Sequence, residues 1–405
     1  MLVCQKYTML SALLRIISVK NRTDLSVLHT NECRSCRAIT QRFTRQCRLI
    51  SRKNYLCKVY EIIRNELTNF DGSGISLLET SHRSKGYMQF NTEVQNVVRR
   101  LLDVPANYKI LFMSGGGTGQ FAAVPLNLIS RTGTADYVVT GDWSAKAAKE
   151  AKKYGKVNLV LPPVDCYVDI PEQSTWNLDP NASYVYICTN ETIHGVEFDF
   201  IPDTKGVPLV ADMSSNFMSK KVDVSKFGVI YGGAQKNIGT AGVVLVIVRE
   251  DLLNQALPIC PSILDWTANA KMDSILNTPP MFAIYVMGRV LEWVERNGGV
   301  EGMAQKATKK ASLIYEVVEQ SNGFYSAPVA KNVRSKMNVP FRIGSPPNDD
   351  LEKEFLKGAE ALSLIQLKGH RAVGGIRASI YNAVTVEEVE ILVKYMKEFQ
   401  KKHSK

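Results

Sequence analysis

The sequence predicts an α/β protein with a large, mainly parallel β-sheet and a smaller α/β domain near the C-terminus. From residue 58 onward, short runs rich in β-branched residues alternate with amphipathic helical stretches. The chain has 405 residues, 45% hydrophobic and 22% charged, a composition near the globular average. This length suggests two or three domains and excludes a peptide hormone or disulfide mini-scaffold. No uncharged apolar run approaches the roughly 18 residues that span a bilayer.

Residues 1–57 form a basic leader that differs from the body of the chain. They contain 11 Lys and Arg against Asp24 and Glu32, so residues 58–405 hold 39 basic against 37 acidic residues. The body therefore lacks the positive excess that nucleic-acid binding requires. Three interpretations of the leader remain open: a mitochondrial-type presequence, a disordered extension or mispredicted first exon, and a zinc element at Cys33 and Cys36. That cysteine pair supplies only two of the four ligands of a closed zinc site, and we predict no metal.

The large domain is predicted over residues 58–295. Two helices are expected between its early strands, at 120–130 and 144–154. Its strands are expected at 109–113, 135–140, 156–161, 183–188, 207–211, 229–231 and 243–248.

The small domain is predicted over residues 296–405. After Pro279, two long helical patterns are separated by Gly298 and Gly299. A strand near 337–343, a helix near 350–362, a strand near 372–380 and a helix near 386–401 then follow.

A glycine-rich turn at residues 114–120 joins the first predicted strand, at 109–113, to the helix predicted at 120–130. Its glycines permit a tight turn, and backbone N–H groups at the positive end of the helix can bind a phosphate. The spacing fits neither the Walker loop nor the dinucleotide motif, so an ordinary turn without a ligand is the alternative.

Asp212 and Lys236 follow two later strands. Asp212 ends an apolar run, at the sheet edge where α/β proteins bind ligands, although a capping or loop role is the alternative. Lys236 lies among small residues in a glycine-rich loop. A partly desolvated lysine there has a lowered pKa and can act as a nucleophile.

Trp143 begins a helix after the second strand, where its ring could stack on a ligand or simply pack in the core. A phosphate turn, an aromatic plate, an acid after a strand and a lysine, in this order, match the needs of pyridoxal phosphate. These needs are anchoring, stacking, a protonated pyridine nitrogen and a Schiff-base amine.

Six motifs of the chain are typical of one family, and they lie at residues 72–84, 115–121, 190–198, 211–217, 233–237 and 368–382. Through these motifs, the chain from Val59 to Lys402 resembles the phosphoserine aminotransferases, a family of fold-type-I pyridoxal phosphate enzymes. The last motif is specific to the phosphoserine branch.

The resemblance implies roles for the cofactor-binding residues. Lys236 holds the cofactor covalently, Asp212 pairs with its pyridine nitrogen and Trp143 stacks on its ring. Four further positions are implied at its phosphate and ring hydroxyl: Gly117, Thr118, Gln235 and Thr192. Thr118 stands where bacterial relatives often have arginine.

The resemblance also implies an obligate homodimer, because Asn277 and Thr278 match residues that the partner subunit supplies. Taken alone, Thr278 followed by Pro279 predicts an ordinary helix start, with Thr278 as the N-cap.

Two His-Arg pairs and one further arginine are the predicted substrate-binding residues. Guanidinium forks suit both phosphate and carboxylate groups, and the matching family positions bind substrate. A single surface arginine would usually be a salt-bridge partner, and His194 could merely shape the loop that contains Thr192. The predicted set is His82, Arg83, His370, Arg371 and Arg377.

The implied activity is ping-pong transamination between phosphoserine and 2-oxoglutarate in serine biosynthesis, in the cytoplasm, with mitochondrial targeting by the leader as a minor alternative. No nucleic-acid or membrane partner is expected. The family's N-terminal segment is missing, so a catalytically impaired paralogue, or the product of a mispredicted gene, is the alternative. A same-fold lyase or desulfurase is disfavoured, since no cysteine lies in a recognisably catalytic loop.

Overall fold

The computed structural model describes residues 55–404, which belong to one compact unit. Most of the predicted leader, including Cys33 and Cys36, lies outside the described residues. The first described element is helix α3 (Tyr55–Glu66), which begins three residues before the predicted start of the body. Within residues 55–404, no helix combines the length and apolar character needed to cross a membrane.

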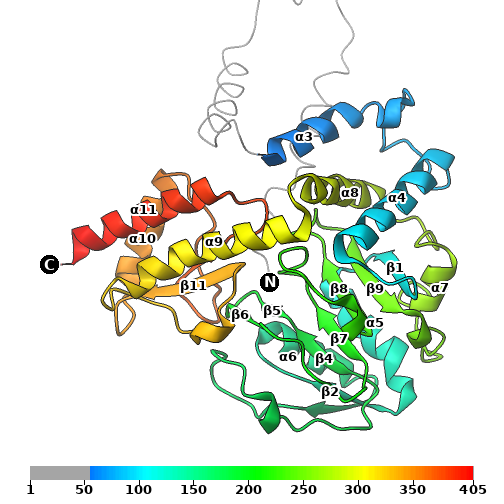
Figure 1. Cartoon of the computed structure of the whole chain (residues 1–405), viewed down its shortest axis with the longest axis horizontal. Coiled ribbons are helices and arrows are strands. Elements are labelled where there is room, and N and C mark those ends of the chain that lie inside the picture. The colour runs from blue at the N-terminus through cyan, green and yellow to red at the C-terminus, as the bar shows by residue number, and fades with distance from the viewer. Residues whose placement is uncertain (1–54, 405) are drawn as a thin grey trace, which may run out of the picture. The chain divides into compact units, whose positions relative to one another are not determined.

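A seven-stranded sheet forms the centre of the fold, and all seven predicted strands are confirmed (Figure 1). Five strands run parallel in the order β8-β7-β4-β2-β3. Strand β9 lies between β1 and β8 and is antiparallel to both, a reversal that the strand pattern in the sequence did not predict. The bounds are β1 Tyr108–Met113, β2 Thr134–Tyr137, β3 Lys156–Leu159, β4 Val185–Cys188, β7 Leu209–Asp212, β8 Val229–Gly233 and β9 Val244–Arg249.

Helices cover both faces of this sheet because its strands are apolar on both sides. In β1, Ile110 and Phe112 belong to one apolar cluster and Leu111 and Met113 to another, as the two-residue period of a strand requires. Helices α4 (Lys85–Leu102) and α8 (Met281–Arg296) pack on the first cluster. Helices α5 (Gly116–Leu128), α6 (Asp142–Ala151) and α7 (Trp266–Lys271) pack on the second.

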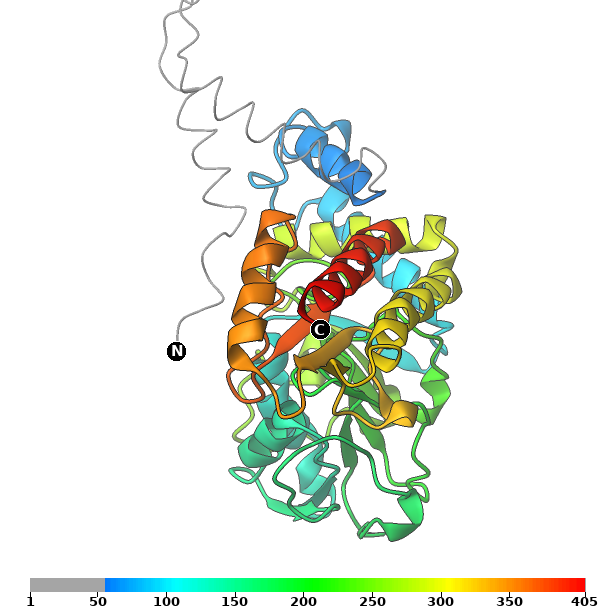
Figure 2. The ribbon, with the colours of Figure 1, turned by 90° about the vertical axis from the view of Figure 1, so that its left-hand side faces the viewer.

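The C-terminal region forms a second, antiparallel sheet of three strands: β10 (Tyr325–Ser326), β11 (Asn338–Ile343) and β12 (Ile376–Ser379). Its apolar cluster draws only on residues 311–399. Figure 2 shows three helices side by side over these strands, in the order α10, α11, α9. Their bounds are α9 Gly299–Glu319, α10 Asp349–Ala361 and α11 Val386–His403.

Helix α3 packs on α8, with Val59 and Ile63 in an apolar cluster that includes Tyr285. Arg289 of α8 and Glu66 of α3 form an ion pair at 2.9 Å. The remaining short elements are β5 (Asn190–Glu191), β6 (Val196–Glu197) and the 3₁₀ turns Phe70–Gly72, Ile129–Arg131, Gln173–Thr175, Val224–Lys226, Glu250–Leu252 and Lys331–Val333.

The start of α8 corrects one expectation. Pro280, not Thr278, is the N-cap, and no side chain caps this helix. Because a residue that precedes a proline is disfavoured in the helical region, Pro279 cannot begin the helix in front of Pro280.

Candidate active site

The carboxyl ends of the parallel strands gather the central predicted residues. Asp212 is the last residue of β7 and pairs in register with Tyr231 of β8, and Lys236 follows the end of β8 by three residues. Asp212 and Lys236 therefore lie at the same edge of the sheet, where open α/β sheets bind ligands.

The Lys236 amine lies in a partly buried, polar environment. Its Nζ donates a hydrogen bond to Thr192 Oγ1 at 2.6 Å and lies 5.3 Å from the centre of the Trp143 ring. Burial lowers the pKa of Lys236, while the negative charge of Asp212 raises it. Asp212 Oδ1 accepts a hydrogen bond from the backbone N–H of Ser214, so it serves the turn rather than bonding to the amine. The neutral, nucleophilic form of Lys236 is thus favoured relative to an exposed lysine.

Glu191 fixes the start of α6 and so the position of Trp143. Its carboxylate accepts hydrogen bonds from the backbone N–H groups of Trp143 (3.0 Å) and Ser144 (2.8 Å) and from Ser144 Oγ (2.6 Å). Glu191 is 0% exposed; burial raises its pKa, and the bonds from Ser144 and Trp143 lower it. A carboxylate at a helix N-terminus is stabilising because it faces the positive end of the helix dipole.

This role of Glu191 was not predicted from the sequence. The residue stands beside Thr192 within the 190–198 motif. That adjacency was the available signal, but only the fold shows that this segment packs against the start of α6.

The glycine-rich turn between β1 and α5 forms as predicted. Gly115 and Gly116 have φ values of 95° and 64°, in the left-handed region that favours glycine. A Cβ atom on Gly117 would lie 3.7 Å from Ser214 Oγ, which itself accepts the backbone N–H of Gly233 at 3.0 Å. The start of α5, the loop after β7 and the end of β8 therefore converge.

This convergence can bind an anion. The first N–H groups of an α-helix have no partner inside the helix, and those of α5 include Gly117 and Thr118. Gln235 is exposed. Its side chain lies beside Gly233, because a Cβ atom on that glycine would lie 2.6 Å from Gln235 Oε1.

Arginine and histidine side chains approach Lys236 and Thr192 from the C-terminal region. Arg377 of β12 donates from Nη1 to the backbone oxygen of Thr192 at 3.4 Å, and its charge lowers the pKa of Lys236. Burial lowers the pKa of His370, and the charges of Arg377 and Arg371 lower it further, while Asp142 raises it. These side chains are close enough to act on one another electrostatically.

Four predicted residues are not brought to this group within one chain. His82 and Arg83 lie in the turn before α4, and Asn277 and Thr278 lie before α8; Arg83, Asn277 and Thr278 are exposed. No described contact joins any of the four to Lys236. His194 makes an edge contact with Tyr167, with ring centres 5.0 Å apart, which agrees with a loop-shaping role.

The donor set fits pyridoxal phosphate. Two buried nitrogen atoms near Lys236, Trp143 Nε1 and Arg377 Nε, have no hydrogen-bond partner among residues 55–404. Unpaired buried donors are costly, so they fit a site that receives an acceptor-rich molecule. An aromatic plate, a buried acid, an amine and a helix N-terminus stand around them.

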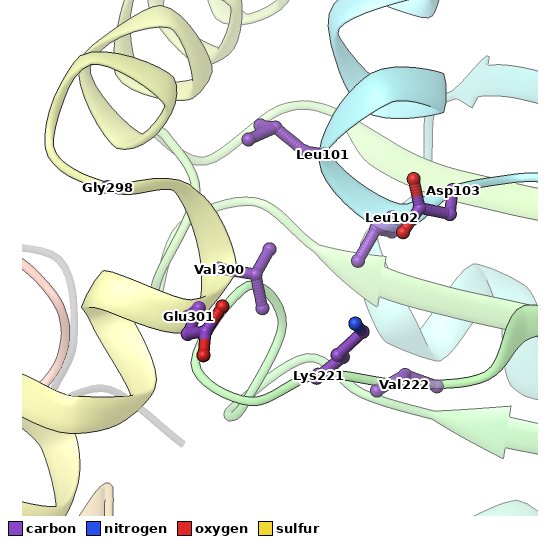
Figure 3. A pocket seen from close by; sticks show the side chains of 8 residues that line it. All are labelled: Leu101, Leu102, Asp103, Lys221, Val222, Gly298, Val300 and Glu301. Carbon is purple, nitrogen blue, oxygen red and sulfur yellow. The ribbon is translucent and has the colours of Figure 1, made fainter.

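A separate cavity of about 170 Å³ contains none of the predicted site residues. It lies between the end of α4 and the start of α9, and Figure 3 shows Asp103, Lys221 and Glu301 around it. A second hollow of about 290 Å³ beside α6 includes Lys149 and Lys152 but likewise no predicted residue. Chemistry, rather than cavity size, therefore identifies the candidate site.

Comparisons with known proteins agree on one family. The family model "Aminotransferase class-V" matches residues 55–392. The chain is 62% identical over 346 residues to a phosphoserine aminotransferase of Drosophila melanogaster, covering 85% of this chain and 95% of that protein. It is 50% identical to a phosphoserine aminotransferase of Pseudomonas putida, covering 84% and 93%.

Solved structures give the same result. A phosphoserine aminotransferase from Bacillus circulans superposes with a TM-score of 0.83 at 43% identity, covering 86% of this chain and 96% of that one. A phosphoserine aminotransferase of Trichomonas vaginalis, described as bound to PLP, superposes with a TM-score of 0.81 at 40% identity, covering 84% and 96%.

Proposed function

The chain belongs to the class-V aminotransferase family, and we propose that it is a phosphoserine aminotransferase that uses pyridoxal phosphate and 2-oxoglutarate. The main support is the position of the Lys236 amine. It donates a hydrogen bond to Thr192 and lies beside the Trp143 ring, and the charge of Asp212 acts on its pKa. The relatives that it matches along most of their length carry the same name.

Lys236 holds the cofactor and moves the reacting proton. When bound, pyridoxal phosphate withdraws electrons from the α-carbon of the amino-acid substrate and makes its proton removable. The Lys236 amine would take that proton from the α-carbon and deliver it to the carbon of the cofactor that came from its aldehyde, acting first as a base and then as an acid. Its lowered pKa supports this role, because a base must be unprotonated near the working pH.

The other cofactor-binding residues orient the ring and anchor the phosphate. Asp212 holds a proton on the pyridine nitrogen, Trp143 stacks on the ring and Thr192 binds near the ring hydroxyl. The convergence of the α5 start with the loops after β7 and β8 supports a phosphate site at Gly117, Thr118 and Gln235.

Arginine and histidine side chains bind the anionic ends of the substrates. Arg377 holds one carboxylate, and the His370-Arg371 pair binds the distal phosphate or carboxylate. The charge of Arg377 acts on Lys236, and the charges of Arg377 and Arg371 act on His370, which supports this assignment. A site with several cations suits phosphoserine, 2-oxoglutarate and glutamate, all of which carry two anionic groups.

The active enzyme is a homodimer with shared active sites. Asn277 and Thr278 of one subunit complete the cofactor site of the other, and His82 and Arg83 complete its substrate site. Two observations support this arrangement. None of the four residues contacts Lys236 within one chain, and three of the four are exposed and so accessible to a partner. Residues 58–295 and 296–405 act as a large and a small domain, and the separate apolar cluster within residues 311–399 supports this division.

The enzyme works in the cytoplasm. Three cysteines of the described chain, Cys166, Cys188 and Cys260, are free, as expected in a reducing compartment. An impaired paralogue is not favoured, because the central site residues come together despite the missing family segment.

A direct assay tests the function. The purified full chain with pyridoxal phosphate should form glutamate from phosphoserine and 2-oxoglutarate. Lys236→Ala should abolish turnover, whereas Lys152→Ala, an exposed lysine beside α6, should leave it unchanged. A wild-type protein that holds the cofactor but does not turn over phosphoserine would disprove the activity, and an active Lys236→Ala variant would disprove the catalytic role.

A further inference from the structure

Lys310 is a buried lysine of α9 that belongs to no part of the site described above. It is 1% exposed. Its Nζ donates three hydrogen bonds to backbone oxygens, those of Ile380 (2.8 Å), Tyr381 (2.7 Å) and Val384 (2.8 Å). All three acceptors lie in the segment 380–384, which connects β12 to α11.

The three acceptors use every donor of an ammonium group. A neutral amine has only two N–H bonds, so only the charged form satisfies all three oxygens. Burial lowers the pKa of Lys310 to about 7, while Glu388 of α11 raises it and Lys306 of α9 lowers it. The carbonyl oxygens also favour the charged form, because hydrogen bonds to a charged group stabilise that group. A cation is therefore built into the small domain at this segment.

The segment 380–384 contacts the loop that contains Lys236. The backbone N–H of Asn382 donates to Asn237 Oδ1 at 2.8 Å, and Asn382 Nδ2 donates to the backbone oxygen of Met218 at 2.9 Å. Asn237 directly follows Lys236 and is itself bonded to the backbone oxygen of Phe217. Asn382 thus fixes the residue next to the proposed catalytic lysine.

The same segment also reaches the loop that contains Thr192. Asn338 Nδ2 donates to the hydroxyl of Tyr381 at 3.1 Å, and Asn338 Oδ1 accepts from Asn190 Nδ2 at 3.0 Å. Asn190 lies two residues before Thr192. In addition, Arg377 of β12 lies three residues before Ile380 and bonds to the backbone oxygen of Thr192.

We propose that Lys310 is a positioning residue for the active site, which holds segment 380–384 so that Arg377 and Asn382 keep their places beside Thr192 and Lys236. The proposal rests on the proposed function for the role of Arg377 in substrate binding. In this role, Lys310 touches neither substrate nor cofactor. A small displacement of a substrate-positioning group can cost up to about 100-fold in rate.

The test is Lys310→Met, which keeps the length and apolar character of the side chain but removes all three donors. We expect kcat/KM for phosphoserine to fall by between about 10-fold and 100-fold, mainly through KM. Lys310→Gln, which retains two donors, should lose less and serves if the methionine variant does not fold. Asn382→Ala removes the side-chain bond to the Met218 oxygen but keeps the backbone bond to Asn237, so it should reproduce part of the loss. The double variant should lose less than the product of the two single effects, because both act through one segment.

Val317→Ala is the matched control, since it truncates a buried side chain two turns further along α9 within the small-domain cluster. It should lower the melting temperature while KM stays unchanged. If Lys310→Met and Lys310→Gln lower the melting temperature but leave KM at the wild-type value, Lys310 has only a structural role and the proposal is wrong.

Amide hydrogen exchange gives a reading that does not depend on activity. The N–H groups of Ile380, Asn382 and Val384 are hydrogen-bonded, and they should exchange faster in Lys310→Met but not in Val317→Ala. Unchanged exchange at these three amides would overturn the proposal. A wild-type protein without activity on phosphoserine would instead disprove the proposed function and leave this measurement decisive for Lys310.

Discussion

At the scale of single residues, the site depends on the amine of Lys236. The amine of an exposed lysine is charged, whereas burial disfavours the charged form at position 236. Burial lowers the pKa of Lys236 below its usual value of 10.5, even though Asp212 acts in the opposite direction. The residue identity and the small neighbours were visible in the sequence. The hydrogen bond to Thr192 was not, because it joins residues 44 positions apart.

The lowered pKa of Lys236 predicts that this residue destabilises the folded protein to an extent that depends on pH. A base whose pKa is lower in the folded than in the unfolded protein binds fewer protons when folded, so stability rises with pH between the folded pKa and 10.5. Lys236→Met should therefore stabilise the cofactor-free protein at pH 7, by about 1 kcal/mol. The advantage should shrink as the pH approaches 10.5.

Urea unfolding of the cofactor-free protein at several pH values measures this effect, since bound cofactor would add stability of its own. Lys152→Met, at an exposed position, should show no such difference. A Lys236→Met variant that is less stable than the wild type at pH 7 would contradict the argument.

At the scale of helices and strands, the sequence predicted which strands exist, and their order along the chain, better than it predicted the direction in which each strand runs. Ten residues connect β8 to β9, fewer than the dozen or more that a crossover between parallel strands needs. The loop length therefore carried the signal for the antiparallel β9, although the strand pattern did not. Strand β10 spans only two residues and has no periodicity to detect. The site at the strand ends was predictable from residue order, whereas the contact of Glu191 with α6 required the fold.

That contact predicts the behaviour of Glu191→Gln. The amide of glutamine would present a donor where Trp143 or Ser144 also presents one, so the start of α6 should lose at least one hydrogen bond. We expect the stability to fall by about 1 kcal/mol, the size of a lost helix cap. Displacement of Trp143 should weaken cofactor binding by about tenfold, which corresponds to about 1.4 kcal/mol.

Equilibrium dialysis with pyridoxal phosphate and thermal unfolding measure the two effects. Glu172→Gln, which removes an exposed carboxylate elsewhere on the chain, is the control and should change neither. Wild-type cofactor affinity in Glu191→Gln would show that α6 is held by other contacts.

At the scale of the whole molecule, the site combines residues from two sheets of one chain. The seven-stranded sheet supplies Asp212, the loop after its strand β8 supplies Lys236, and the three-stranded sheet supplies Arg377. His82, Arg83, Asn277 and Thr278 remain outside this group. In the proposed dimer, the residues that complete a shared site come from another copy, so the spacing within one sequence carries no signal for their grouping.

Shared sites predict complementation between two inactive variants. In a heterodimer of Lys236→Ala and Arg83→Ala subunits, one site carries both defects, and the other combines an intact Lys236 with an intact partner Arg83. Random pairing gives half heterodimers with one active site each, so co-expression should restore about a quarter of the wild-type activity. Lys236→Ala with Thr278→Ala should behave in the same way, to the extent that Thr278→Ala alone is impaired. The control is Lys236→Ala with Arg377→Ala, because both residues belong to the site of their own chain and every site in that mixture keeps a defect. Activity restored in the control as well, or in none of the three mixtures, would show that the subunits do not share these residues.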